Sequence, residues 1–455
     1  MRRPAPFSPP VCLTIAGSDS GGGAGIQADL KAMEAAGVFG TTVITAVTAQ
    51  HTQGVDRSFV LPIEEIRAQL EAVTGDIAVD AVKTGMLATR PVIELVTAFA
   101  READIPLVVD PVMVAASGDR LLDADAEDAY AELIREATVV TPNTDEAAVL
   151  TGREITSPAD ATAAAEALVN TGANAALVKG GHLDGEQVTN VLATTDETCT
   201  FHHRRIDSAA THGSGCTLAS TIAARIAHGD GLQAAVETAL ERMNRAVRYP
   251  IDIGAGPGTV NHLASIRNDA ALPGVINGVR EVVAEFVAAD VSVLVPEVGM
   301  NVVGATPYAE DRRDTAAVEG RITRTATGIR PNLGVARGAS SHVARFLLAS
   351  REFVPTLQYC VNCRFDDDIE VALAELGWET AEYDREHEPD EDAEGQTMQW
   401  GAAAAFETAP TTPVAVIDRG AHGKEPIVKL LASDTATLTG RTLTLAETVA
   451  TIQSV

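Results

Sequence analysis

The chain has 455 residues, a formal net charge of −29 and a sequence pI near 4.6. Because an acidic surface repels nucleic-acid phosphates, we expect no nucleic-acid partner. No apolar run reaches the ~18 residues that a membrane span needs, and the run after Met1-Arg2-Arg3-Pro4 is too short for a signal peptide. We therefore expect a cytoplasmic protein with no membrane partner. Five lysines stand against 29 arginines. This balance is typical of salt-adapted organisms, with an ordinary acidic protein as the alternative.

Five cysteines are spread along the chain, at Cys12, Cys199, Cys216, Cys360 and Cys363. An odd number in a chain of this length argues against a disulfide framework. Cys360 and Cys363 form a lone CxxC pair, whereas a zinc site normally needs a second pair or nearby histidines. We expect two reduced cysteines there.

The first 260 residues alternate β-branched runs with alanine-rich helical stretches. In chain order the pattern predicts a strand over Val11–Ala16, a helix over Ile26–Ala36, a strand over Thr42–Thr48, a helix over Ile63–Val73, strands over Ala81–Lys83, Leu107–Asp110, Val139–Thr141 and Ala176–Val178, and helices over Cys216–Ala227 and Leu232–Val247. This alternation indicates an α/β fold with a mostly parallel sheet covered by helices on both faces. Functional loops of such a sheet gather at the carboxyl ends of its strands.

A glycine-rich stretch near Gly254–Gly258 closes this region. We expect a first domain over residues 1–265, a linker over residues 266–274 and a second α/β domain over residues 275–455. The second domain is expected to contain a helix over Gly274–Ala288, a strand over Ser292–Val295, and further elements at Val302–Ala305, Ser341–Ser350, Asp368–Leu376 and Val414–Asp418. The acidic run Tyr383–Glu394 is expected to be a solvated surface loop.

A glycine-rich loop, Ala16–Asp29, follows the first expected strand and opens a helix. Glycines let a backbone approach a ligand closely. The loop does not match a dinucleotide-binding fingerprint, because the third glycine would fall at Ile26, and it lacks the lysine and hydroxyl residue of a P-loop. A ligand-binding loop and a tight strand-to-helix turn are both open interpretations.

A second loop, Thr211-His212-Gly213-Ser214-Gly215-Cys216, also opens a helix. Its small residues leave backbone N–H groups accessible, and the helix presents its positive end. Such a nest suits a transferring phosphoryl group and indicates a small-molecule kinase. Because a thiol pKa tends to fall at a helix N-terminus, Cys216 is a candidate acceptor of a substrate hydroxyl proton. A small buried residue is the alternative.

Three polar elements follow other expected strands. Glu146 and Asn143, in the segment Pro142–Glu146, are candidate ligands of Mg²⁺ through water. Asp110 ends a strand, and Lys179 precedes two glycines. We expect Asp110, Lys179 and Thr211 to bind the nucleotide.

Together these stretches resemble the hydroxymethylpyrimidine/phosphomethylpyrimidine kinases of thiamine biosynthesis, in the ribokinase superfamily. The resemblance covers about the first 265 residues and rests on Ala16–Asp29, Val47–Gln50, Lys83–Met86, Asp110–Met113, Pro142–Glu146, Lys179–His182 and Thr211–Cys216. It implies two successive ATP-dependent phosphorylations of 4-amino-5-hydroxymethyl-2-methylpyrimidine.

The resemblance also implies roles for single residues. Gln50 and Asp29 would hydrogen-bond the aminopyrimidine, and Gly17, Met86 and Val112 would line its pocket. Cys216 stands where the wider superfamily has an aspartate base, and the catalytic loop would comprise Gly213, Ser214, Gly215 and Cys216. ATP and Mg²⁺ are the implied cofactors.

Residues from about 275 onward resemble the thiamine-phosphate synthase domain that is often fused behind this kinase in archaea. The matching stretches are Val295–Asn301, Glu319–Ile322, Gly334–His342 and Asp418–Gly420. The resemblance implies coupling of the pyrimidine diphosphate with hydroxyethylthiazole phosphate, releasing pyrophosphate. Arg321 and His342 match the functional arginine and histidine, and Arg330, Arg337 and Lys424 are further candidates for binding phosphate.

Two alternatives stay open. The second domain could instead sense thiamine phosphate, and the kinase could act on pyridoxal or a related vitamin, although Gln50 argues against that. The expected partners are small molecules: the pyrimidine and its phosphate, ATP and the thiazole phosphate. We also expect a homo-oligomer.

Overall fold

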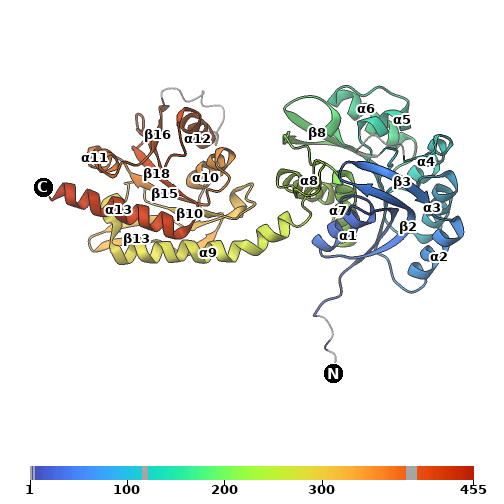
Figure 1. Ribbon diagram of the computed structural model, residues 1–455, viewed down its shortest axis with the longest axis horizontal. Coiled ribbons are helices and arrows are strands. Elements are labelled where there is room, and N and C mark those ends of the chain that lie inside the picture. The colour runs from blue at the N-terminus through green and yellow to red at the C-terminus, as the bar shows by residue number, and fades with distance from the viewer. Residues whose placement is uncertain (1–2, 4–5, 115–120, 386–396, 455) are drawn as a thin grey trace. The chain divides into compact units, whose positions relative to one another are not determined.

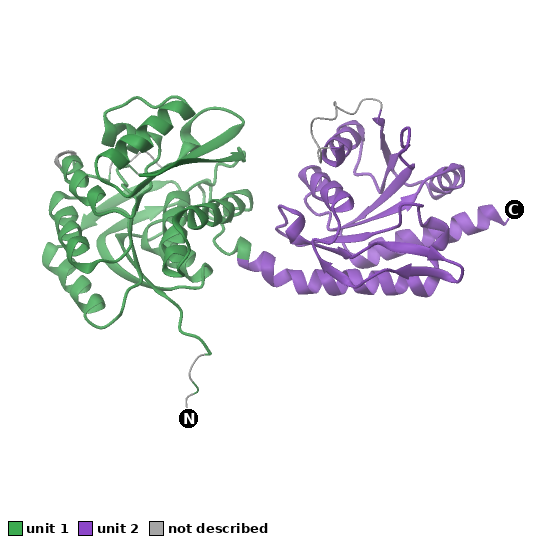
Figure 2. Cartoon of the chain, turned by 180° about the vertical axis from the view of Figure 1, so that it is seen from behind, with its two compact units in different colours: residues 1–265 green, residues 266–455 purple. Residues whose placement is uncertain are grey.

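The computed structural model describes residue 3 and residues 6–114, 121–385 and 397–454 (Figure 1). The chain folds into two compact units, residues 1–265 and residues 266–455 (Figure 2). In the described ranges, no helix is both long and apolar enough to cross a membrane. Each unit is an α/β structure with its own sheet and its own buried cores.

The first unit is built on a nine-stranded sheet with the order β3-β2-β1-β4-β5-β6-β7-β8-β9. Its strands are β1 (Val11–Asp19), β2 (Phe39–His51), β3 (Gly54–Val60), β4 (Ala81–Thr84), β5 (Leu107–Val109), β6 (Val139–Val140), β7 (Ala175–Val178), β8 (Gln187–Thr194) and β9 (Thr198–Arg204). The six central strands, from β2 to β7 in the sheet order, pair in parallel, and β3, β8 and β9 pair antiparallel at the edges. The expected mostly parallel sheet is confirmed.

Helices cover both faces of this sheet. They are α1 (Gly25–Ala35), α2 (Ile63–Thr74), α3 (Arg90–Ala103), α4 (Tyr130–Arg135), α5 (Thr144–Thr151), α6 (Pro158–Asn170), α7 (Ser214–Ala227) and α8 (Leu232–Arg248), with 3-10 turns η1 (Ala124–Ala129) and η2 (Gly180–His182). Because side chains of a strand alternate between faces, Cys12 packs with residues of α1, α7 and α8, whereas Leu13 packs with residues of α2, α3, α4 and α6.

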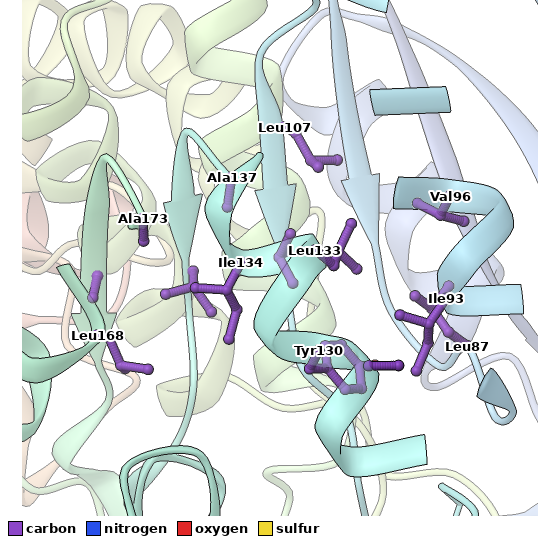
Figure 3. Packing of buried hydrophobic residues seen from close by; sticks show 14 of the residues in the cluster. Leu87, Ile93, Val96, Leu107, Tyr130, Leu133, Ile134, Ala137, Leu168 and Ala173 are labelled. Atoms are coloured by element: carbon purple, nitrogen blue, oxygen red, sulfur yellow. The ribbon is translucent and has the colours of Figure 1, made fainter. Parts of the chain in front are cut away.

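The second of these cores is a continuous apolar layer. Figure 3 shows Ile93 and Val96 of α3, Leu133 and Ile134 of α4, and Leu107 of β5 within it. Burial of such side chains contributes roughly 1.5–3 kcal/mol each. The layer fixes the parallel strands, and it thereby fixes the loops that leave their carboxyl ends.

The second unit contains a seven-stranded sheet with the order β14-β11-β10-β15-β18-β17-β16, and a separate hairpin of β12 and β13. Its strands are β10 (Val302–Ala305), β11 (Thr315–Val318), β12 (Ile322–Thr325), β13 (Gly328–Pro331), β14 (Val335–Arg337), β15 (Tyr359–Arg364), β16 (Thr380–Tyr383), β17 (Ala415–Asp418) and β18 (Ile427–Ala432). Only β16 and β17 pair in parallel among the described neighbours of this sheet.

Its helices are α9 (Ala264–Ala289), α10 (His342–Phe353), α11 (Asp367–Leu376), α12 (Thr397–Thr408) and α13 (Thr435–Gln453), with 3-10 turns η3 (Val291–Leu294) and η4 (Arg312–Asp314). Residues of α9, α11 and α13 share one core with the sheet, and residues of α10 and α12 share another. This unit is therefore also layered on both faces of its sheet.

Two expectations for the second unit are wrong in detail. The segment Ser292–Val295 does not form a strand, because most of it lies in the 3-10 turn η3. Residues 266–274, expected as a linker, are helical, since α9 runs through Pro273 without ending. Asn268 in this stretch is buried and donates a hydrogen bond from Nδ2 to Oδ1 of Asp314 at 2.6 Å. Most of the acidic run Tyr383–Glu394 lies outside the described residues.

The CxxC pair lies on strand β15, with both thiols buried and reduced. Residues three apart on a strand point to opposite faces, and Cys360 and Cys363 indeed belong to different cores. Burial raises the pKa of Cys360 to about 12 and that of Cys363 still further. Two thiols on opposite faces cannot chelate one ion, which agrees with the expectation of two reduced cysteines.

Candidate active sites

A cavity of about 860 Å³ opens at the carboxyl ends of the parallel strands in the first unit. Its walls come from the segments after β1, β4, β5, β6 and β7 and from the first turn of α7. It contains all but one of the site residues expected in this unit: Gly17, Gln50, Met86, Asp110, Val112, Asn143, Glu146, Lys179, Thr211, Gly213, Ser214, Gly215 and Cys216. A volume at the upper end of the usual range for ligand pockets can hold two small molecules side by side.

The loop at residues 211–216 forms the N-terminus of α7. Ser214 donates its N–H to the carbonyl of Thr211 at 3.0 Å, which closes the turn. Gly213 has φ +81°, and a Cβ at this position would lie 1.9 Å from the carbonyl oxygen of Gly23. Glycine is therefore required where the two glycine loops touch. Gly215 and Cys216 follow in the first helical turn, whose N–H groups have no intrahelical acceptor and suit an anion.

Two opposite charges face each other beside this turn. The Lys179 ammonium contacts Oδ1 of Asp110 at 3.0 Å, and both side chains are largely buried. A Cβ on Gly215 would lie 3.4 Å from Nζ of Lys179. Burial alone would lower the pKa of Lys179, but Asp110 and Glu146 outweigh it, so its pKa is raised and the ammonium keeps its charge. A permanent cation thus lies next to the anion nest.

Glu146 and Asn143 are fixed by a reciprocal capping box at the start of α5. Each side chain accepts a hydrogen bond of 2.8 Å from the backbone N–H of the other residue. Burial raises the pKa of Glu146 to about 7, Lys179 lowers it, and the nearby charge of Asp110 raises it further. A bound cation would stabilise the ionised form of this carboxylate.

The donor set fits a hydrated Mg²⁺. This ion usually keeps several waters and binds one or two carboxylates together with substrate phosphates. Glu146 and Asp110 both line the cavity. Within the described ranges, no group of three or more His, Cys, Asp or Glu side chains could hold a metal by itself. Glu146 and Asp110 therefore fit an ion that is held together with a phosphate ligand.

Cys216 does not have the acidic thiol expected from its place at a helix N-terminus. Burial raises its pKa to about 11, and the positive charge of Lys83 offsets this only in part. At neutral pH the thiol is protonated, because burial disfavours the thiolate. The expectation of a lowered pKa is wrong, and the case for Cys216 as a proton acceptor weakens with it.

Asp29 does not line the cavity, which contradicts its expected direct contact with the pyrimidine. Its carboxylate is fully buried and bonded to Lys83 Nζ at 2.8 and 2.9 Å, Thr14 Oγ1 at 2.6 Å and Ser220 Oγ at 2.7 Å. Lys83, in contrast, lines the cavity. Burial would lower the pKa of Lys83, but the charge of Asp29 outweighs this and raises it. Asp29 therefore affects the cavity through Lys83, whose ammonium it holds in place.

A further cluster in the cavity wall was missed by the sequence analysis. Asp19 accepts hydrogen bonds from the N–H groups of Gly21, Gly23 and Ala24 at 2.7, 2.9 and 2.7 Å. His212 Nε2 lies 3.3 Å from Asp19 Oδ2 and 3.4 Å from Gln50 Nε2. Burial alone would raise the pKa of Asp19, but the hydrogen bonds from His212, Ala24 and Gly21 outweigh it and lower that pKa. The Asp19 carboxylate thus shapes the first glycine loop and links it to Gln50.

In the second unit, Arg321 and His342 belong to one neighbourhood. His342 is the first residue of α10, and its Nδ1 lies 3.1 Å from Oγ of Ser341. Burial lowers the pKa of His342, and the charges of Arg321, Arg345, Arg385 and Lys429 lower it further. Arg321 has φ +69°, rare for a side chain of this size, and its guanidinium donates to the carbonyl of Val298. Strain of this kind often accompanies functional positions.

The remaining candidate cations of the second unit lie in local structures. Arg330 is exposed on the β12–β13 hairpin, and Arg337 Nε donates to the carbonyl of Arg313. Lys424 pairs with Ala421 through backbone hydrogen bonds in a tight loop. Lys429 and Arg385, which no motif indicated, are instead among the charges that lower the pKa of His342.

The fold and the first cavity define a small-molecule kinase. A family model for phosphomethylpyrimidine kinase matches residues 19–261, more than half of the chain, and the chain belongs to this family. A second model, thiamine-phosphate synthase ThiN, matches residues 278–443. The chain therefore joins a kinase domain of thiamine biosynthesis to a thiamine-phosphate synthase domain, and the resemblances of both halves are confirmed.

Individual relatives agree. The hydroxymethylpyrimidine/phosphomethylpyrimidine kinase of Streptomyces coelicolor is 46% identical over 258 residues, which are 56% of this chain and 96% of that protein. The thiamine biosynthesis bifunctional protein ThiED of Geobacter sulfurreducens is 44% identical over 263 residues, covering 57% of this chain and 54% of that protein. Among solved structures, an ADP complex of Bacillus subtilis pyridoxal kinase has a TM-score of 0.54 and 35% identity, covering 57% of this chain and 99% of that one.

Proposed function

We propose that the first unit phosphorylates 4-amino-5-hydroxymethyl-2-methylpyrimidine twice with ATP, giving the monophosphate and then the diphosphate. The second unit couples this diphosphate with hydroxyethylthiazole phosphate, giving thiamine phosphate and pyrophosphate. The observation that carries the first half is that one cavity is lined by Gln50, Met86 and the first turn of α7. An amide, apolar walls and an anion nest are what an aminopyrimidine and a phosphoryl donor need.

In the acceptor half of the cavity, the Gln50 amide hydrogen-bonds the aminopyrimidine, and Gly17, Met86 and Val112 contact its ring. The amide is held in place, because Thr48 Oγ1 donates to Gln50 Oε1 at 3.1 Å. Substitution of Gln50 should therefore raise KM for the pyrimidine more than KM for ATP.

In the donor half, Lys179, Thr211 and Asp110 bind the nucleotide, with Asp110 orienting the Lys179 ammonium. Glu146 and Asn143 would hold Mg²⁺ through water. When bound, this ion would neutralise charge on the phosphate oxygens. The N–H groups of Gly213, Gly215 and Cys216 lie in or next to the turn that would meet the transferring group, and Ser214 closes that turn through its N–H bond to Thr211.

Each transfer forms a bond from the acceptor oxygen to the γ-phosphorus and breaks the bond from that phosphorus to the bridging oxygen of ADP. The first acceptor is an alcohol, whose proton passes to water or to an oxygen of the transferred phosphoryl group, and the second is an ionised phosphate. Because the Cys216 thiol is protonated at neutral pH, we assign Cys216 a role in positioning the loop rather than the role of base. A loose transition state needs little proton removal in advance.

For the second unit, Arg321 and His342 are the proposed functional pair. The cations that lower the pKa of His342 would oppose the negative charge of the departing pyrophosphate. A neutral imidazole can donate one hydrogen bond and accept another without adding to the charge.

The proposal is tested with the purified full chain, ATP and Mg²⁺. We expect ADP release with the pyrimidine and with its monophosphate, and pyrophosphate release when pyrimidine diphosphate and thiazole phosphate are supplied directly. Tight binding of thiamine phosphate without turnover would assign the second unit a sensing role. No release of either product would refute both halves.

A second candidate activity is the phosphorylation of pyridoxal. It is favoured by the similarity of the first unit to a pyridoxal kinase structure. The same assay compares kcat/KM for the pyrimidine and for pyridoxal, and a higher value for pyridoxal would reverse the order of the two proposals.

We also propose a cytoplasmic homo-oligomer adapted to high salt. The charge of −29 and the shortage of lysine support the adaptation. Activity should rise with molar salt, and light scattering should give a mass above that of one chain.

A further inference from the structure

Arg205 follows strand β9, and its side chain reaches back to the loop of residues 181–185, which connects β7 to β8. Its Nε donates to the carbonyl of Gly185 at 2.7 Å, and its Nη1 donates to the carbonyl of Gly181 at 2.8 Å. Its Nη2 donates to the carbonyl of Leu183. Within the part of the chain that the structure describes, no carboxylate pairs with this guanidinium. All three of its nitrogens therefore serve the 181–185 loop.

The 181–185 loop belongs to the wall of the cavity beside Lys179. Gly181 and His182 line the cavity, as do Lys179 and Arg205 themselves. Only Gly180 separates Lys179 from the loop, and the N–H of Gly180 donates to a side chain of β8, Oδ1 of Asn190, at 3.2 Å. The chain thus passes from the proposed nucleotide-binding lysine into a loop that Arg205 holds.

The loop has a second side-chain anchor, at the start of α5. His182 Nδ1 lies 2.8 Å from Oδ2 of Asp145, but these side chains are 55% and 80% exposed. Exposed pairs of this kind contribute little to stability. Arg205 is half-buried and forms three charge-assisted hydrogen bonds, which are stronger than neutral ones. Arg205 is therefore the stronger of the two anchors.

The shape of the guanidinium is what this loop uses. The group is planar and carries five N–H donors in a fixed fork, whereas an ammonium has all its donors on one nitrogen. Here three separate nitrogens meet three separate carbonyls. Lysine would supply the same charge, but it could not hold all three carbonyls at once.

We propose that Arg205 is a positioning residue for the donor nucleotide, because it holds the 181–185 loop in the conformation that completes the nucleotide half of the cavity. The inference rests on the proposed binding of ATP beside Lys179. Without the fork the loop samples other conformations, and the apparent affinity falls with the fraction of chains that remain competent to bind. A loss of this kind raises KM and leaves kcat unchanged.

The test measures ADP binding to the full chain by titration calorimetry, together with the kinetics of ATP and pyrimidine turnover. Arg205→Lys should raise Kd for ADP and KM for ATP by roughly 10- to 100-fold, the equivalent of one or two lost charge-assisted hydrogen bonds. Both kcat and KM for the pyrimidine should stay near the wild-type values. Arg204→Lys is the matched control, because Arg204 is the neighbouring arginine and is exposed on β9; it should change none of these quantities.

Two further measurements separate positioning from a general loss of stability. Hydrogen exchange in the peptide covering residues 180–186 should be faster in Arg205→Lys than in Arg204→Lys. In Arg205→Gly, added ethylguanidinium should restore ADP binding, whereas ethylammonium, which has the same charge, should not. If Arg205→Gly does not fold, the exchange and binding data for Arg205→Lys decide the question.

Wild-type ADP affinity in Arg205→Lys would overturn the proposal, as would a lower kcat with unchanged KM for ATP. Equal rescue by the two cations would also overturn it, because charge rather than the fork would then be responsible. If ADP binding depends on Arg205 but the chain phosphorylates no pyrimidine, the role of Arg205 stands and the proposed kinase activity fails.

Discussion

The contact between the two glycine loops gives a sharp prediction for Gly213→Ala. A Cβ at Gly213 would lie 1.9 Å from the carbonyl oxygen of Gly23, whereas real contacts of this kind essentially never fall below 3.0 Å. The two loops must therefore separate by at least about 1 Å. Such a displacement of catalytic groups can lower the rate by ~100-fold. The left-handed backbone at φ +81° adds a cost of about 1–2 kcal/mol to stability.

Gly229→Ala is the matched control for this change. Gly229 follows the other end of α7 and has φ +89°, but nothing lies within 4 Å of a Cβ there. It should show the same backbone cost without moving the catalytic loop. We therefore expect kcat for the first phosphorylation to fall ~100-fold in Gly213→Ala and to stay near wild type in Gly229→Ala.

The assay couples ADP release to a spectroscopic signal, and thermal unfolding reports stability. A Gly213→Ala protein with a kcat within a few-fold of Gly229→Ala would refute the reasoning, since it would show that the loops separate without consequence for transfer. A fall in both variants would attribute the effect to helix α7 as a whole rather than to the contact with Gly23.

Three other predictions concern the same cavity. Cys216→Ala should slow both phosphorylations by similar factors, because a thiol with a pKa of about 11 is not the base; selective slowing of the first would restore that role. Lys83→Met should lower the free energy of unfolding of the first unit by about 3–5 kcal/mol, because it leaves the buried Asp29 carboxylate unpaired. The double variant Lys83→Met with Asp29→Leu leaves no unpaired buried charge, so it should recover most of this loss in denaturant titrations. An equal loss of unfolding free energy in the single and double variants would contradict this reasoning. Because the pKa of Glu146 is raised in the folded chain, its contribution to the free energy of unfolding is complete below about pH 4.5 and is lost as pH rises to about 7. Glu146→Gln should flatten this decline, which is measured as the pH dependence of the free energy of unfolding.

Much of the first unit could be predicted from its sequence. Runs such as Val11–Ala16 and Ala176–Val178 read as buried strands because both faces of a parallel sheet are covered, and the glycine loops after them locate the cavity. The helical spacing around Asp29 also predicts that its side chain is buried. Asp29 is three residues after Ile26 and four before Met33, both buried, so its carboxylate had to face the core and needed a partner.

The contacts that could not be predicted depend on long-range register. Nothing near Lys429 in sequence points to Tyr383 or Asp418, which meet it only because β17 pairs with both β16 and β18. The pKa of Cys216 could not be predicted for a related reason. Its position at the start of α7 indicated a lowered pKa, but burial of the thiol in the folded chain raises it, and the carboxylates of Asp29 and Asp110, distant in sequence, raise it further.

Residues 266–274 are helical rather than a linker, and this limits where the chain can be divided into two separate proteins. A fragment that begins at residue 275 would lack Asn268 and leave the buried Asp314 without one of its hydrogen-bond donors. Thr306, whose hydroxyl also bonds to Asn268, would lose an acceptor. Expression of a separate second enzyme should therefore start ahead of Asn268, and a junction for swapping in another kinase belongs among the residues that precede α9.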